Sequence, residues 1–104
     1  MRIEFERSGG FAGLLVRASV DTAALPANEA GQLEEWVEQA GFFSLPERLR
    51  GAPSAADRFL YRLTIESGDR RHTVEMGESA VPPALSPLVD WLTDAARRRG
   101  RPPP

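Results

Sequence analysis

The sequence contains no cysteine, no lysine and only one histidine, His72, among its 104 residues. Without cysteine there is no disulfide, no thiolate ligand for zinc and no cysteine nucleophile. Without lysine there is no side-chain amine that forms a Schiff base. A single histidine does not supply a two-histidine metal site, and its place within an alternating segment predicts a hydrogen-bonded histidine of a strand. We therefore expect a protein that is not an enzyme and holds no cofactor and no metal.

A strong net charge and long apolar runs are also absent. The formal net charge is −2, so no global positive field attracts nucleic acid. No apolar run approaches the roughly 20 residues that span a bilayer, and residues 1–7 alternate where a signal peptide has an apolar core. We expect a cytoplasmic, monomeric protein that binds neither a membrane nor nucleic acid, and a chain of this length fits one domain.

Four segments show the alternation of apolar and polar residues that is typical of half-buried strands. They are residues 2–8, 14–21, 58–67 and 70–76. In the first of them Ile3 and Phe5 share one face, and in the third the alternation is the most regular of the chain. Gly68-Asp69 supplies a turn between the last two segments. The pattern predicts two hairpins, the first with a glycine-rich connection longer than a two-residue turn.

Two further segments have the spacing of an amphipathic helix. In residues 27–40 the apolar positions are Leu33, Trp36, Val37 and Ala40. Gly41 is placed to end this helix. The second helix is predicted to begin with Ser86 as N-cap and Pro87 at the first helical position. Its apolar positions are Leu88, Val89, Leu92 and Ala96.

The predicted order of elements is β-β-α-β-β-α. Because an isolated hairpin is marginally stable, both hairpins are expected in one sheet. The prediction is an α+β fold, with a four-stranded, mainly antiparallel sheet that carries both helices on one face. Residues 48–56 contain Gly51 and Pro53 and are expected to form an exposed loop. Residues 1–96 then form a single domain, followed by an Arg- and Pro-rich flexible tail at residues 97–104.

One segment contains an aromatic residue that the predicted fold does not account for. It consists of Ser8, Gly9, Gly10, Phe11, Ala12 and Gly13. Its glycines suit a connection that needs positive φ, but it matches neither Gly-x-Gly-x-x-Gly nor the Walker pattern, and it opens a strand instead of a helix. We therefore expect no nucleotide site. An aromatic side chain at a loop tip, as Phe11 is, either folds back onto the core or anchors a partner, and position alone leaves both readings open.

The other polar clusters have simpler interpretations. The acidic residues Glu34, Glu35 and Glu38 fall on the wet face of the predicted helix. Arginines at 70–71 and 97–101 lack interleaved aromatic residues, which favours a solvated surface over a nucleic-acid site. Two readings stay open at this point: a regulatory module that docks on another protein, and a nucleic-acid binder that uses these arginines.

The sequence resembles the emfourin family over roughly residues 1–92. The resemblance is carried by Ser8-Gly9-Gly10-Phe11-Ala12-Gly13, Asp21-Thr22 with Leu25-Pro26, Phe42-Phe43-Ser44-Leu45-Pro46, Asp57-Arg58-Phe59-Leu60-Tyr61, His72-Thr73-Val74, and Val81-Pro82-Pro83-Ala84-Leu85 with Pro87-Leu88. The first run is the most specific, and the order of the others adds weight.

Emfourins are small protein inhibitors of thermolysin-like zinc metallopeptidases, the M4 family. The resemblance implies the same role here, a bacterial source, and an M4 peptidase as partner. We expect residues 8–13 to bind over or into the active-site cleft. Phe11 is then the apolar anchor, because thermolysin-like peptidases favour a large apolar residue just after the scissile bond. The glycines allow a close approach of the backbone.

Overall fold

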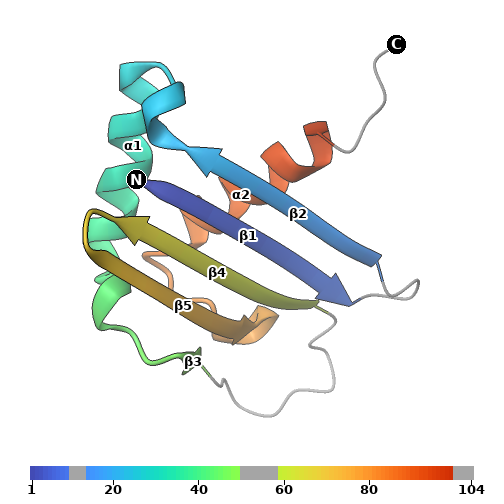
Figure 1. Ribbon diagram of the computed structural model, residues 1–104. Helices are drawn as coiled ribbons and strands as arrows, with labels where there is room; N and C mark the ends of the chain where they lie inside the picture. The colour runs from blue at the N-terminus through green and yellow to red at the C-terminus, as the bar shows by residue number, and fades with distance from the viewer. Residues whose placement is uncertain (10–13, 50–58, 100–104) are drawn as a thin grey trace.

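The computed structural model describes residues 1–9, 14–49 and 59–99 (Figure 1). The strands are β1 (Arg2–Gly9), β2 (Leu14–Asp21), β3 (Arg48–Leu49), β4 (Phe59–Ser67) and β5 (Arg70–Gly77). The helices are α1 (Ala27–Gln39) and α2 (Ser86–Arg99). Short 3-10 helices are η1 (Thr22–Ala24), η2 (Phe42–Ser44) and η3 (Glu78–Ala80). The predicted strands and helices therefore exist in the predicted order, and β3 is an addition to them.

The described strands form one sheet in the order β2-β1-β4-β5-β3. Strand β1 pairs antiparallel with β2 on one side and with β4 on the other along its whole length. Strand β4 pairs antiparallel with β5. Both helices lie on one side of this sheet, as the sequence predicts, and leave the other side open (Figure 1). The fold is α+β.

The prediction of a four-stranded sheet is wrong in one respect. Arg48 and Leu49, which the sequence places in an exposed loop, form the short strand β3 and pair parallel with β5. The backbone N–H of Glu75 also donates to the carbonyl of Glu47 at 2.7 Å. The sheet is therefore mixed and has five strands. Two residues are too few to show an alternation, and their partner is distant in sequence, so the segment gives no local signal.

The hydrophobic core lies between the inner face of the sheet and the two helices. Its buried residues are Ile3, Phe5, Ala18, Val20, Leu33, Val37, Phe42, Leu63, Ile65, Val74, Met76, Leu85, Leu88, Val89, Leu92 and Ala96. All four apolar positions predicted for α2 belong to this core. In α1, Leu33 and Val37 are buried, while Trp36 and Ala40 are partly buried against them. The alternation of each strand therefore gives the correct inner face.

The end of α1 is held against the sheet. Gly41 follows the helix with φ 59°, the left-handed conformation expected of a residue that ends a helix. Phe42 then enters the core, and its ring packs edge-on against His72 with centroids 5.5 Å apart. Nε2 of His72 donates to the carbonyl of Leu45 at 2.6 Å. The interpretation of His72 as a hydrogen-bonded strand histidine is confirmed.

The second helix differs slightly from its prediction. Ser86, expected as the N-cap, is already the first helical residue. Its backbone N–H donates to the carbonyl of Pro82 at 3.1 Å, so a hydrogen-bonded turn at residues 82–86 precedes the helix. The helix continues to Arg99, so residues 97–99, the first of the Arg- and Pro-rich segment, form its last turn. Residues 100–104 lie outside the described residues.

Candidate protein-binding site

The candidate site begins where β1 ends. Ser8 and Gly9 are the last residues of β1, whereas Gly10, Phe11, Ala12 and Gly13 lie outside the described residues. Gly9 has φ 115°, which favours glycine and confirms the expectation of positive φ at this connection. The structure thus describes the strand end that immediately precedes residues 10–13, which we call the base of the segment.

This base is paired on both sides. Ser8 lies opposite Leu15 of β2 and Leu60 of β4, and Gly9 lies opposite Leu14 and Phe59. The end of β1, the start of β2 and the start of β4 therefore meet at one end of the sheet (Figure 1). A segment that leaves from a strand held on two sides starts from a fixed position, which lowers the entropy lost when a partner binds it.

On the inner face, Arg7 reinforces this base. Its guanidinium carbon lies 3.7 Å from the centroid of the Phe59 ring. A cation over an aromatic face contributes about 0.5–2 kcal/mol, depending on how far it is desolvated. Nε of Arg7 is buried without a hydrogen-bond partner among the described residues. The contact therefore joins the end of β1 to the first residue of β4.

Tyr61 lies beside Arg7 on the same face. Its ring stacks on Phe5 with centroids 5.8 Å apart. Burial raises the pKa of the Tyr61 hydroxyl above its ordinary value, and the carboxylates of Glu78 and Asp90 act in the same direction, while Arg7 opposes them. The hydroxyl is therefore neutral at physiological pH, which suits a side chain that packs on the inner face of the sheet, beside the base of the segment.

On the outer face, the side chain of Ser8 stands between two exposed leucines. Leu15 is 51% exposed and Leu60 is 49% exposed, and they are the large apolar side chains that the described residues leave exposed. Gly77 of β5 continues the same line beyond Leu60. We call these four residues the leucine row. It crosses β2, β1, β4 and β5 at the end of the sheet where β1 ends and where β2 and β4 begin.

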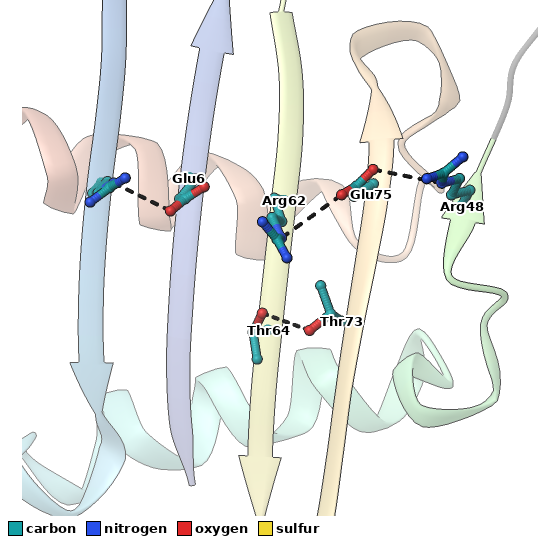
Figure 2. A network of polar contacts seen from close by, with 7 residues as sticks. Glu6, Arg48, Arg62, Thr64, Thr73 and Glu75 are labelled. Atoms are coloured by element: carbon teal, nitrogen blue, oxygen red, sulfur yellow. Dashed lines mark hydrogen bonds and ion pairs between the residues drawn. The ribbon is translucent and has the colours of Figure 1, made fainter.

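The neighbouring line of residues on this face carries alternating charge (Figure 2). It consists of Arg17, Glu6, Arg62, Glu75 and Arg48, one from each strand in spatial order. We call it the charged row. Glu6 lies 3.3 Å from Arg17, and Glu75 lies 3.9 Å from Arg62 and 3.8 Å from Arg48. These pairs are solvent-exposed, and each such pair contributes about 0–1 kcal/mol.

Elsewhere the surface agrees with the simpler interpretations. Glu34, Glu35 and Glu38 are exposed along α1, next to an open hollow of about 480 Å³. Arg70 covers the ring of Phe43, and Arg71 pairs with Glu66 at 3.8 Å. These two arginines are thus engaged within the protein, which weakens the reading of a nucleic-acid site.

Within residues 1–9, 14–49 and 59–99, no three histidine or carboxylate side chains come together in a way that suits a metal ion. None of the helices in these ranges is long and apolar enough to cross a membrane.

Sequence reasoning missed one part of the site and found another only in part. The contact between Arg7 and Phe59 joins residues of two strands that only the sheet order brings together. The leucine row has a partial signal, because alternation turns Leu15 and Leu60 outward. Nothing in the sequence shows that both leucines lie opposite Ser8.

The fold and this geometry define a small α+β domain whose distinctive feature is an anchored surface at one end of its sheet. Residues 5–93 match the family model Emfourin, and the chain belongs to the emfourin family. This membership is consistent with the role of a protease inhibitor and with a protein that is not an enzyme. Comparisons with curated proteins and with solved structures found no match.

Proposed function

We propose that this protein inhibits a thermolysin-like zinc metallopeptidase of the M4 family, and that residues 8–13 bind over or into its active-site cleft. The observation that carries the proposal is the emfourin match over residues 5–93. The structure supports it by placing Ser8 and Gly9 in a strand that is paired on both sides. Inhibition of this kind needs a well-held segment and no catalytic group.

Each part of the segment has a proposed role. Phe11 is the apolar anchor, since a large aromatic side chain that enters a pocket is the typical hot spot of an interface. Gly10 and Gly13 let the backbone approach the rim of a cleft closely. The contact of Arg7 with Phe59 and the two ladders of β1 hold the base in place while the peptidase binds. We place the protein in the bacterial cytoplasm as a monomer.

The direct test is titration of thermolysin with the purified full-length protein and with a Phe11→Ala variant. We expect wild-type protein to inhibit. We expect Phe11→Ala to raise the inhibition constant about 30- to 1,000-fold, which corresponds to about 2–4 kcal/mol for a hot-spot aromatic residue. Phe43→Ala is the matched control, because Phe43 lies under Arg70 at the far end of the sheet.

Thermal unfolding of all three proteins separates binding from folding. An unchanged inhibition constant in folded Phe11→Ala would remove Phe11 from the interface. A loss of stability without a loss of affinity would place its side chain in the core. A folded wild-type protein that leaves thermolysin-like peptidases active would contradict the inhibitor function and favour a module that docks on a different protein.

A further inference from the structure

We propose that the leucine row is a second contact surface for the same peptidase, adjoining residues 8–13 and bordered by the charged row. This inference rests on the proposed function, because it names more of the surface that the partner covers. It concerns the residues Leu15, Ser8, Leu60 and Gly77, all of which the structure describes.

The first observation is where the exposed apolar side chains lie. Leu15 and Leu60 are far apart in sequence, yet each lies directly opposite Ser8, on either side of β1. With strands about 4.8 Å apart, the two side chains stand roughly 10 Å from each other. Ser8 between them and Gly77 beyond are small, so the leucines project from their surroundings. Single exposed leucines are ordinary, but two that converge on one residue form a patch.

The second observation is the arrangement around the patch. The charged row runs alongside it, with its ion pairs open to solvent. Farther along the same face, Oγ1 of Thr64 and Oγ1 of Thr73 are 2.9 Å apart (Figure 2). Among the described residues, the outer face therefore exposes large apolar side chains at the end of the sheet where β1 ends and where β2 and β4 begin. An apolar centre with a polar rim is the usual anatomy of a protein interface.

The third observation identifies the occupant. Ser8 belongs both to the leucine row and to the 8–13 segment, so a partner that contacts Ser8 also meets Leu15 and Leu60 on either side of it. A second copy of this chain is a poorer fit. A stable interface buries about 800 Å² on each partner, far more than two half-exposed leucines supply. A face-to-face dimer would also have to bury the charged row. As an extension of a larger contact, the small patch is sufficient.

The test compares two double variants with wild type for inhibition of thermolysin. Leu15→Thr with Leu60→Thr removes the apolar patch and introduces β-branched residues, which suit strands. Ser19→Thr with Thr64→Ser is the matched control, because it changes the same two strands on the same face, four residues farther along each strand. We expect the first double variant to raise the inhibition constant at least tenfold, mainly through faster dissociation, and the control to stay within twofold of wild type.

Each outcome has one meaning. Inhibition by wild type with an unchanged constant in the leucine double variant overturns the second surface and leaves the proposed function standing. No inhibition by folded wild type overturns both. Sedimentation velocity adds a third arm: a wild-type dimer that the leucine double variant dissociates would assign the row to a second copy and overturn the proposal.

Discussion

The two faces of the sheet differ in what their side chains do, although the same strands supply both. On the inner face, Leu63 is completely buried against the helices. On the outer face, three residues earlier in the same strand, Leu60 is half-exposed. Because successive residues of a strand point to opposite faces, a change on one face leaves the other face in place. Under the proposed function, stability and recognition are thus assigned to opposite faces of the same strands.

The largest effect that tests this separation is expected from Leu63→Ala. Truncation of a fully buried leucine costs about 2–5 kcal/mol, from lost burial and from the cavity left behind. Denaturation by urea measures this loss of unfolding free energy. At temperatures where the variant is folded, its inhibition constant toward thermolysin should equal that of wild type.

Leu60→Ala is the matched comparison, because it makes the same change on the opposite face of β4. Surface substitutions usually change stability by about 0.5 kcal/mol or less. We expect Leu60→Ala to keep the stability and to weaken inhibition, by less than the double variant of Leu15 and Leu60 does, which is the reverse of Leu63→Ala. A pair of leucine variants that changed both properties together would show that the two faces are coupled.

A smaller effect is expected in the charged row. Glu75 faces both Arg62 and Arg48, so Glu75→Gln removes the acceptor of two ion pairs at once. Because these groups are exposed and screened by solvent, the loss of stability should be below about 1 kcal/mol and should vanish at high salt. Urea denaturation at two ionic strengths measures it. Glu34→Gln on α1 removes the same charge away from the row and serves as control.

The smallest effect is a pH dependence from the inner face. Burial raises the pKa of Tyr61 in the folded protein, so the unfolded chain loses this proton first as pH rises. Stability is therefore fully present below the ordinary tyrosine pKa of about 10 and falls as the pH passes through that value.

Tyr61→Phe keeps the ring that stacks on Phe5 and should remove this part of the alkaline decline. Tyr61 is the single tyrosine of the sequence, so its ultraviolet titration in the folded protein reports this pKa directly. An identical decline in both proteins, or a titration midpoint at or below the ordinary value, would contradict the prediction.

Much of the fold is predictable because strands and helices each produce a local periodicity of apolar residues in the sequence. Alternation in residues 58–67 gives the inner positions Leu63 and Ile65, and helical spacing gives Leu88 and Leu92. Gly41 marks the end of α1 through its left-handed backbone. These features depend on neighbours a few positions away, which the sequence contains in full.

The remaining features depend on contacts between distant segments. Strand β3 exists because residues 48–49 meet β5, and its two residues carry no period of their own. The leucine row depends on β1 lying between β2 and β4, an order that the strand patterns leave open. For residues 8–13, sequence motifs name the segment, and the structure adds the position of Ser8 and Gly9.

The central place of β1 also bears on how the chain folds. Its partner β4 follows only after β2, α1 and β3. The β1–β2 hairpin forms from neighbouring residues, but its second ladder requires closure of a long loop, which is slow and costs chain entropy. Until β4 docks, the apolar side chains of Ile3 and Phe5 lack their neighbours Ile65 and Leu63. Docking of β4 therefore also buries the apolar side chains and pairs the free edge of β1, both of which could otherwise associate with other chains.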